Sequence, residues 1–373
     1  MFDAPYRLNP QVADEVLSPG LLIFRDLVQK NIETMIAIAR GADRLRPHVK
    51  THKMAEIVRL SESKGIHKHK CATLAEAEMV AAAGGVDVLV SYPIVGPNLK
   101  RFAHLIRGYR KTTFRATVDA IEAARMLSEA MTGLDRPVPV LVDLEVGMGR
   151  TGIAPGEAAA ELYAEIGRLP NLVADGLHAY DGHIREMDVE ERRKNTVSTR
   201  QPVLSLLETL RNRGFEVPRL VLGGTPTFPI HAALDLPGVE CSPGTVVLHD
   251  DGYATKFPDL PFTPAALLLT RVVSKPRPGR LCLDLGHKAV AADPAGPRAR
   301  ILGLDDAKPI IHSEEHLVVE TAHADELPIG TPLLAIPTHV CPTIALHRFA
   351  GVIEDGAIVG RWEVTARDRV VGL

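Results

Sequence analysis

Residues 138–183 read VPVLVDLEVGMGRTGIAPGEAAAELYAEIGRLPNLVADGLHAYDGH and predict a strand, a helix and a second strand in turn. The first segment, VPVLVDLEV (138–146), is rich in β-branched residues, as buried strands are. In PGEAAAELYAEIGRL (155–169) the apolar residues repeat at i, i+3 and i+4, which predicts a helix whose first turn suits Pro155. GLHAYDGH (176–183) then predicts the second strand. Two strands joined by a helix pair in parallel through a right-handed crossover.

The same alternation extends over the first two thirds of the chain. The predicted strands are HVK (48–50), KCATL (70–74), DVLVSYP (87–93), FRATVD (114–119), VPVLVDLEV (138–146), GLHAYDGH (176–183), RLVLGGTPT (219–227) and VECSPGT (239–245). Eight strands alternating with helices are typical of a closed (β/α)8 TIM-type barrel. An open doubly wound sheet is the alternative, which periodicity alone does not exclude. We favour the barrel, over residues 20–252.

The helical pattern stops after about residue 253. The later apolar segments follow one another as strands broken by Pro and Gly turns. They are ALLLTRVVSK (266–275), RLCLDLG (280–286), HLVVETA (316–322), TPLLAIP (331–337) and GRWEVTARDRVVGL (360–373). We expect a separate antiparallel β domain over residues 253–373, joined by the N-terminal segment 1–19.

Composition limits the class of function. A net charge of -3 argues against nucleic acid or an anionic membrane surface as the main partner. No apolar run reaches the roughly 18 residues that span a bilayer. The N-terminus, MFDAPYRLNPQ, lacks the pattern of a signal peptide. Four widely spaced cysteines (Cys71, Cys241, Cys282 and Cys341) fit a reducing compartment, so we expect a cytoplasmic protein.

Barrel geometry gives a role to RPHVKTHK (46–53), because reactive groups in such barrels follow the C-terminal ends of strands. Lys50 ends the first predicted strand, whereas Lys53 falls beyond it. The turns GGTPT (223–227) and SPGT (242–245) combine glycines with hydroxyls after the last two strands, where phosphate sites are common. A phosphate site and a lysine suggest pyridoxal phosphate held as a Schiff base. The alternatives are ordinary turns and a solvated lysine.

Six motifs together resemble a known family. They are LSPGLLIFRDLVQKNI (17–32), RPHVKTHK (46–53), DLEVGMGRTGI (143–153), HAYDGH (178–183), GGTPT (223–227) and CSPGT (241–245). They are similar to the fold-type III pyridoxal-phosphate enzymes, and within them to the D-threonine aldolase and D-serine dehydratase group. The resemblance covers nearly the whole chain. It implies an alanine-racemase-like barrel, a C-terminal β domain and a head-to-tail homodimer.

The resemblance also implies roles for individual residues. Lys50 would carry the cofactor, with Lys53 as the rival attachment point. The cofactor-binding residues are predicted as Lys50, Arg150, Tyr180, Gly224, Thr225, Thr227, Ser242, Gly244 and Thr245. Arg150 has an ion pair with Asp143 or Glu145 as its alternative role, and Tyr180 has packing inside the barrel. His52 and His183 are the candidate catalytic bases, although each is equally consistent with a structural histidine.

A metal site is predicted in IPTHVCPTIALH (336–347). His339 and Cys341 stand two apart on a strand-like run, so their side chains would project to one face. Packing in the core is the alternative. The resemblance implies a divalent metal held by this histidine and a ligand two residues later, which is cysteine in the zinc-dependent D-serine dehydratases and aspartate in the best-known D-threonine aldolases. A thiolate favours zinc over manganese or magnesium.

These residues predict a lyase acting on D-3-hydroxy amino acids, small molecules whose β-hydroxyl oxygen the metal would polarise. We favour retro-aldol cleavage of the D-threonine aldolase type, giving glycine and an aldehyde. Dehydration of D-serine, D-threonine or 3-hydroxyaspartate to a 2-oxo acid and ammonia is the close alternative. A two-base racemase like alanine racemase is disfavoured because no tyrosine follows Tyr253. A non-catalytic pyridoxal-phosphate carrier would need neither the β domain nor the His339 and Cys341 pair.

Overall fold

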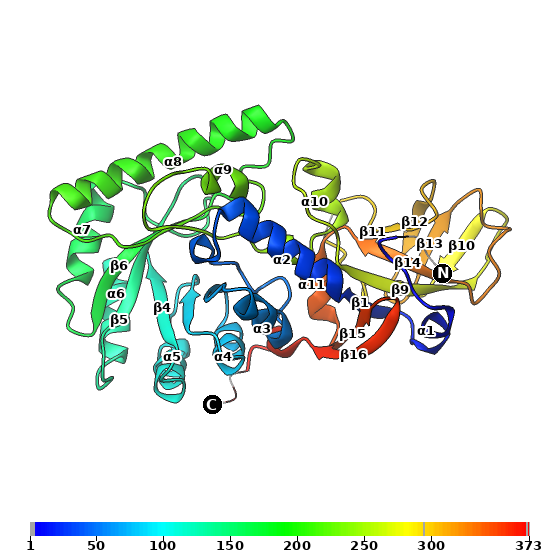
Figure 1. Ribbon diagram of the computed structural model, residues 1–373, viewed down its shortest axis with the longest axis horizontal. Helices are drawn as coiled ribbons and strands as arrows, with labels where there is room; N and C mark the ends of the chain where they lie inside the picture. Colours follow the sequence, from blue (N-terminus) through cyan, green and yellow to red (C-terminus); the bar gives the residue numbers. More distant parts are fainter. Residues whose placement is uncertain (1–3, 294, 371, 373) are drawn as a thin grey trace. The chain divides into compact units, whose positions relative to one another are not determined.

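The computed structural model describes residues 4–293, 295–370 and 372, and the chain forms two compact units (Figure 1). The barrel unit takes its described residues from Met35–Lys50, Ala55–Gly244 and Asp368–Leu373. The β unit takes its described residues from Met1–Thr34, Thr51–Met54 and Thr245–Arg367. The predicted limits of the barrel, 20 and 252, therefore differ from the observed grouping at both ends.

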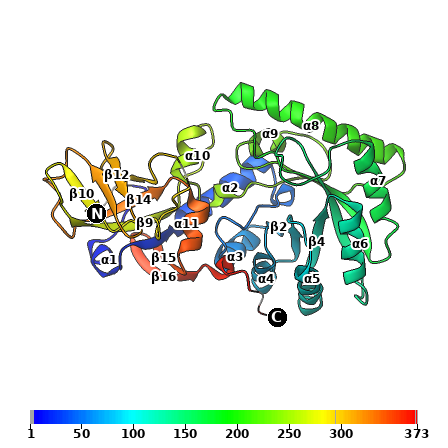
Figure 2. The same ribbon diagram turned by 180° about the vertical axis from the view of Figure 1, so that it is seen from behind.

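The barrel unit contains seven strands that pair in chain order, each parallel to the next. They are β2 (Lys68–Cys71), β3 (Asp87–Val90), β4 (Thr113–Val118), β5 (Val138–Leu144), β6 (Leu172–Ala179), β7 (Leu220–Leu222) and β8 (Val239–Cys241). Figures 1 and 2 show α5 to α8 outside these strands. This arrangement confirms the predicted alanine-racemase-like α/β barrel. Inside it, Leu89, Leu141 and Val221 form a buried apolar cluster.

The segment before Lys50 closes the ring of strands. Leu45 bridges Cys241 of β8, and His48 bridges Lys70 of β2, both in parallel. The predicted strand 48–50 is thus wrong in detail, because only isolated bridges form and the chain turns at Val49 and Lys50. Lys50 consequently lies in a turn that directly follows the closing bridge.

Helices cover the barrel strands and connect them. In the barrel unit they are α3 (Ala55–Ser63), α4 (Leu74–Ala82), α5 (Pro97–Gly108), α6 (Ile121–Ala130), α7 (Glu157–Ile166), α8 (Val189–Asn212), α9 (Phe228–Ala232) and the 3-10 helix η1 (Ala42–Arg44). Helix α2 (Arg25–Ala39) leads from the β unit into the barrel unit. Helix α7 buries Ala159, Leu162 and Tyr163, the i, i+3, i+4 stripe that the sequence predicts, and Ile166 one turn later. It begins after Gly156, so Pro155 precedes the helix.

The β unit is built on a mostly antiparallel sheet. Its elements are α1 (Pro10–Glu15), β1 (Gly20–Phe24), η2 (Thr245–Val247), α10 (Asp251–Lys256), β9 (Ala266–Ser274), β10 (Arg280–Leu283), β11 (Ala299–Ile301), β12 (Lys308–His312), β13 (Leu317–Glu320), β14 (Pro332–Pro337), α11 (Val340–Leu346), β15 (Phe349–Glu354), β16 (Ala357–Glu363) and η3 (Thr365–Arg367). Strand β1 lies between β9 and β15 and runs parallel to β15. Leu22, Leu267 and Ile336 belong to its buried core. Residues 20–24, predicted to begin the barrel, therefore belong to this sheet.

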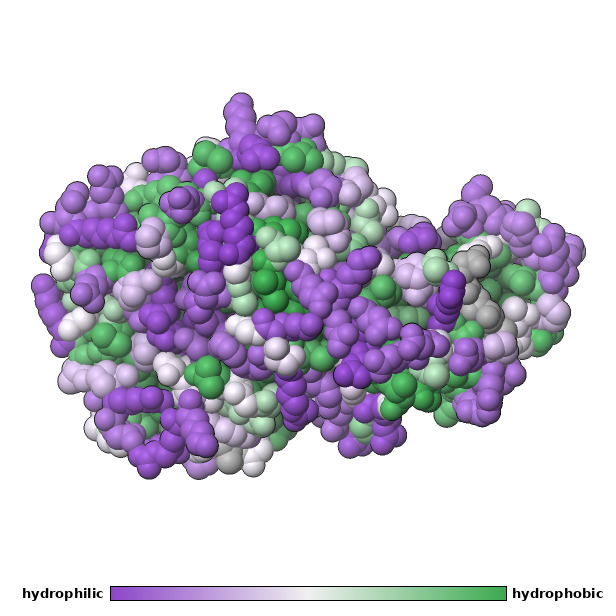
Figure 3. Space-filling model, in the orientation of Figure 1, coloured by the Kyte–Doolittle hydropathy of each residue, from purple (hydrophilic) through white to green (hydrophobic). Residues whose placement is uncertain are grey.

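The surface is polar over much of the face drawn in Figure 3, and its hydrophobic residues gather in smaller groups. Within the part of the chain that the structure describes, every helix is too short or too polar to cross a membrane. The four cysteines, all within the described residues, form no disulfide with one another.

Candidate active site

Lys50 is held at the barrel by the backbone around it. The Val49 N–H donates to the Lys70 carbonyl, and the Lys70 N–H donates to the Pro47 carbonyl, so this segment is anchored to β2. The Lys50 N–H donates to His48 Nδ1 over 3.2 Å. The Lys50 side chain is half-buried and its Nζ lies 5.9 Å from the centre of the Tyr180 ring. A lysine amine is therefore fixed beside an aromatic ring at the end of β6.

Three cationic groups lie near the Tyr180 ring. Besides Lys50, the Lys70 Nζ lies 5.7 Å and the Arg150 Cζ 5.0 Å from the ring centre, distances at which a cation is attracted to the face of a ring. The Arg150 backbone N–H donates to Glu145 Oε2, and the ion pairs between described side chains do not include the guanidinium of Arg150. The structure thus brings the predicted residues Lys50, Arg150 and Tyr180 together.

The turns after β7 and β8 contribute backbone N–H groups and hydroxyls. The Gly224 N–H lies 3.2 Å from Thr227 Oγ1, and the Gly244 N–H lies 3.4 Å from Thr225 Oγ1. The Thr227 hydroxyl also donates to Asp181 Oδ1 over 2.8 Å, and the Ser242 hydroxyl donates to the Arg46 carbonyl. The Thr227 and Ser242 hydroxyls thus donate to groups of the protein itself, while the Gly224 and Gly244 amides face the hydroxyls of Thr227 and Thr225 across the two turns.

The donor set fits a phosphorylated pyridine. The three cationic groups near the Tyr180 ring attract an anion, and glycine amides at two strand ends can donate hydrogen bonds to a phosphate. A Cβ added to Gly224 would lie 3.0 Å from Tyr180 Cε2, so any larger residue would require the ring to move by a few tenths of an ångström. Thr245 belongs to the β unit, where its Oγ1 lies 3.7 Å from Cys341 Sγ.

Sequence reasoning missed a buried chain of polar groups beside Tyr180. The Lys70 Nζ lies 3.4 Å from His178 Nε2, and His178 Nδ1 lies 2.6 Å from Asp143 Oδ1. The Thr151 hydroxyl donates to Asp143 Oδ2 over 2.9 Å. Burial lowers the pKa of His178, and the nearby charge of Lys70 lowers it further. The signal for Lys70 was its place in β2, between two residues whose side chains point the other way.

The two candidate bases lie in different surroundings. His52 is buried in the β unit, and its Nδ1 accepts the Met54 N–H over 3.1 Å. His183 belongs to the barrel unit and is exposed, with its ring against Gly147, where an added Cβ would come 2.5 Å from Nε2. His183 is thus accessible to solvent, whereas the His52 ring accepts a hydrogen bond from its own turn.

His339 and Cys341 meet, but on a helix rather than a strand. The predicted strand-like run is wrong because β14 ends at Pro337 and α11 begins at Val340, with His339 at its N-cap. Nδ1 of His339 lies 2.5 Å from Asp293 Oδ2. Hydrogen bonding to Cys341, and then to Asp293, raises the pKa of His339 to about 9 against the effect of burial.

Other side chains of the β unit fix the Cys341 thiol. Thr51 Oγ1 lies 3.2 Å from Cys341 Sγ. Asp250 accepts the Val340 N–H over 3.0 Å and the Tyr253 N–H over 2.8 Å, so one carboxylate caps both α10 and α11. Three or more histidine, cysteine or carboxylate side chains do not gather as a metal cluster anywhere in the described chain. His339 and Cys341 are therefore a hydrogen-bonded pair, with Asp293 beside the His339 ring.

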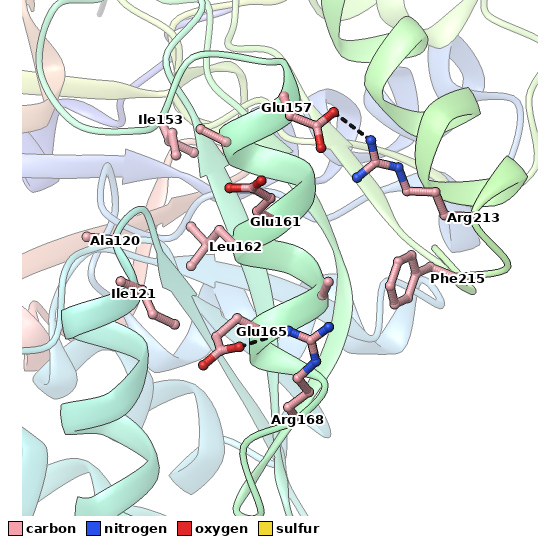
Figure 4. Close-up of a pocket in the computed structure, with 12 residues that line it drawn as sticks. Ala120, Ile121, Ile153, Glu157, Glu161, Leu162, Glu165, Arg168, Arg213 and Phe215 are labelled. Carbon is pink, nitrogen blue, oxygen red and sulfur yellow. Dashed lines mark hydrogen bonds and ion pairs between the residues drawn. The ribbon is translucent and has the colours of Figure 1, made fainter.

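A hollow of about 700 Å³ lies elsewhere in the barrel unit, on the outer face of α7 (Figure 4). Glu157 pairs with Arg213 across it, and Glu165 pairs with Arg168. None of its lining residues is a predicted site residue. The chemistry is therefore better placed at Lys50 and Tyr180.

Two family models match the chain. The model described as the alanine racemase N-terminal domain matches residues 23–248. The model described as a putative serine dehydratase domain matches residues 265–353. Together they span both the barrel strands and most of the later β strands.

Curated relatives match over almost the full length. D-threonine aldolase of Arthrobacter sp is 30% identical, over 94% of this chain and 92% of the relative. 3-Hydroxy-D-aspartate aldolase of Paracoccus denitrificans is 28% identical, over 95% of this chain and 93% of the relative. These relatives are lyases.

Solved structures agree with the fold. The crystal structure of D-threonine aldolase from Filomicrobium marinum covers 98% of this chain and 99% of its own, with a TM-score of 0.88 and 30% identity. A D-threo-3-hydroxyaspartate dehydratase, solved as a cysteine-to-alanine mutant in the metal-free form, covers 97% of this chain and 99% of its own. Its TM-score is 0.82 and its identity 23%, which shows a shared fold.

Proposed function

This chain belongs to the alanine racemase N-terminal domain family and carries a serine dehydratase domain after it, and from that premise we propose that it is a lyase for D-3-hydroxy amino acids. The proposed reaction is retro-aldol cleavage of the D-threonine aldolase type, which gives glycine and an aldehyde. The observation that carries this choice is the match to D-threonine aldolase at 30% identity over 94% of the chain.

The proposed cofactor is pyridoxal phosphate, on which enzymes of this family depend. Its ring stores the electron pair released when a bond at the substrate Cα breaks. Lys50 would supply the amine that attaches it. Arg150 and Tyr180 would flank its ring, since the Tyr180 ring lies near both Lys50 and Arg150. The Gly224 and Gly244 amides and Thr225 would donate to its phosphate.

A divalent metal is the second proposed cofactor, held by His339 and Cys341. The metal-free form of a mutant D-threo-3-hydroxyaspartate dehydratase indicates that the unmodified protein of that kind holds a metal. The pair fits zinc, since a thiolate and an imidazole are ligands that zinc prefers. A divalent cation supplies a Lewis acid for a β-hydroxyl oxygen. The Thr51 and Asp250 contacts would keep the two ligands in place.

Dehydration to a 2-oxo acid and ammonia is the second candidate. The observation that favours it is Cys341, because the group's zinc-dependent dehydratases are those expected to use cysteine at this position. A D-threo-3-hydroxyaspartate dehydratase of Delftia sp. is 25% identical over 93% of this chain. Either reaction needs the same Lys50 amine, so the fold of the barrel does not separate them.

One substrate separates the two reactions. The protein is incubated with D-threonine, pyridoxal phosphate and a zinc or manganese salt, and the products are identified. Glycine with acetaldehyde supports the aldolase, whereas 2-oxobutanoate with ammonia contradicts it and supports the dehydratase. Lys50→Ala is expected to abolish either reaction. Lys53→Arg is the matched control and is expected to keep it, because the Lys53 amine is directed to the Ala366 carbonyl.

We also propose a cytoplasmic homodimer. The lack of a disulfide among the four cysteines supports the compartment, and the family resemblance supports the dimer. Sedimentation equilibrium of the holoenzyme would measure a mass of twice 40.4 kDa if the dimer is right.

A further inference from the structure

Lys70 is the second amine at the cofactor site that the sequence motifs leave without a role. It is 2% exposed, and its Nζ is as close to the Tyr180 ring as that of Lys50, at 5.7 Å against 5.9 Å. Its backbone is bonded to Pro47 and Val49, the segment that carries Lys50. The two lysines are thus fixed relative to each other through the same bridge that closes the barrel.

The polar partners of Lys70 form a directed chain. Asp143 accepts from Thr151 and lies 2.6 Å from His178 Nδ1, which places a proton on Nδ1 and leaves Nε2 as an acceptor. The Lys70 Nζ then donates to His178 Nε2 over 3.4 Å. The Asp143 carboxylate orients the imidazole, and the imidazole Nε2 accepts a hydrogen bond from the Lys70 amine. Lys70 can therefore pass a proton to His178 without leaving its buried position.

The two carboxylates that face Lys70 both have other hydrogen-bond partners. Lys50 and Arg150 are cationic neighbours, whereas Asp143 and Asp181 are anionic. Asp143 is already bonded to His178, and Asp181 to His231 at 2.6 Å. The ion pairs of the described side chains do not include Lys70. Burial and then the charge of Lys50 together lower the pKa of Lys70 to about 7, so Lys70 changes charge near neutral pH.

We propose that Lys70 is a positioning residue that takes up a proton when an aldehyde cofactor is attached at Lys50. When an aldehyde condenses with the neutral Lys50 amine, one C=N bond forms and the carbonyl oxygen leaves as water. The anionic phosphate that arrives with the aldehyde favours the charged form of Lys70, so Lys70 takes up a proton. This inference rests on the proposed function, because it requires pyridoxal phosphate at Lys50. The positive charge gained by Lys70 would then offset part of the negative charge that the phosphate brings.

Calorimetric titration tests the coupling. Pyridoxal phosphate is added to the cofactor-free protein at pH 7.5 in two buffers with different heats of ionisation, and the buffer-dependent heat gives the protons taken up. The wild type is expected to take up a measurable fraction of a proton per site more than Lys70→Met or Lys70→Arg, neither of which can titrate. Lys100→Met, an exposed lysine of α5, is the control and should match the wild type.

The results of the titration distinguish failure of the proposed function from failure of the role of Lys70. Absence of binding heat in the wild type would overturn the proposed function. Binding with the same proton uptake in the wild type and both Lys70 variants would overturn the role of Lys70 alone. A purely structural role would change the affinity but leave the buffer-dependent heat unchanged. If neither variant folds, the uptake by the wild type between pH 6 and 9 decides: a rise centred near pH 7 supports the inference, and a flat profile contradicts it.

Discussion

His178 links Lys70 to Asp143 deep inside the barrel. Replacing it by alanine leaves the Lys70 amine and the Asp143 carboxylate without their common partner. A buried polar group left unsatisfied costs about 1–3 kcal/mol. We expect His178→Ala to lower the free energy of unfolding by about 2 kcal/mol in urea denaturation. His183→Ala removes an exposed ring and should leave it unchanged; equal losses in the two variants would contradict the buried chain.

Cys341 is the residue on which the choice of metal depends. Its thiolate is the soft ligand of the pair, so Cys341→Ala is expected to weaken zinc binding more than tenfold. The measurement is zinc affinity by competition with a chromogenic chelator. Cys282→Ala, in β10 of the same unit, is the matched control. Undiminished zinc affinity in Cys341→Ala would remove the cysteine from the proposed site.

Single residues were predicted best where they follow a strand. Tyr180 and Arg150 stand near Lys50 as the motifs indicated. Lys70 was missed because KHK looks like a solvated run, and its burial depends on which face of β2 turns inward. Thr227 and Ser242 carry hydroxyls as predicted, but hydrogen bonds to Asp181 and Arg46 engage them, which no local pattern shows.

An ion network ties the strands of the barrel together. Arg46 is completely buried and donates to Asp87 over 2.7 Å and to Glu240 over 2.6 Å. Arg115 donates to the same Asp87 and to Asp175, which also pairs with Arg219. Breaking a buried pair leaves an uncompensated charge. Strands β3, β4, β6 and β8 therefore depend on one another through this network.

Asp87→Asn tests the network. We expect a loss of about 3 kcal/mol in the free energy of unfolding at pH 7, because Arg46 and Arg115 lose their shared carboxylate. Burial would raise the pKa of Asp87, but the two arginines hold it well below its usual range. Its stabilisation is thus complete above about pH 4 and is lost as the pH falls further.

Urea denaturation of the wild type and of Asp87→Asn at several pH values measures this pH-dependent stabilisation. The wild type should lose stability more steeply below pH 4 than Asp87→Asn. Asp135→Asn, in an exposed pair with Arg110, is the control and should behave as the wild type does. Parallel pH profiles for wild type and Asp87→Asn would contradict the assigned role.

Periodicity predicted which helices and strands form, but it predicted less well where they begin and end. The helix from residue 157 and the strands on either side of it follow the pattern of the sequence. Residues 339–341 were misassigned to a strand, because the helix start is set by Asp250, which caps α11 from 90 residues away. A cap from a distant segment leaves no local signal.

The whole chain combines a barrel with a mostly antiparallel sheet, as the change of pattern near residue 253 predicts. The family is also confirmed, because its motifs are spread over nearly the whole chain. The assignment of each strand to one of the two units was not predictable. Strand β1 has the composition of a barrel strand, yet it pairs with β9 and β15. Pairing between distant strands depends on partners that sequence order does not reveal.

The central claim is that Lys50 carries the cofactor. The most direct test is borohydride reduction of the protein loaded with pyridoxal phosphate, followed by proteolysis and mass mapping of the modified peptide. The prediction is a single modified lysine, Lys50, and no modification in Lys50→Ala. Modification of Lys53 or Lys70 in the wild type, with Lys50 unmodified, would contradict the account of the site.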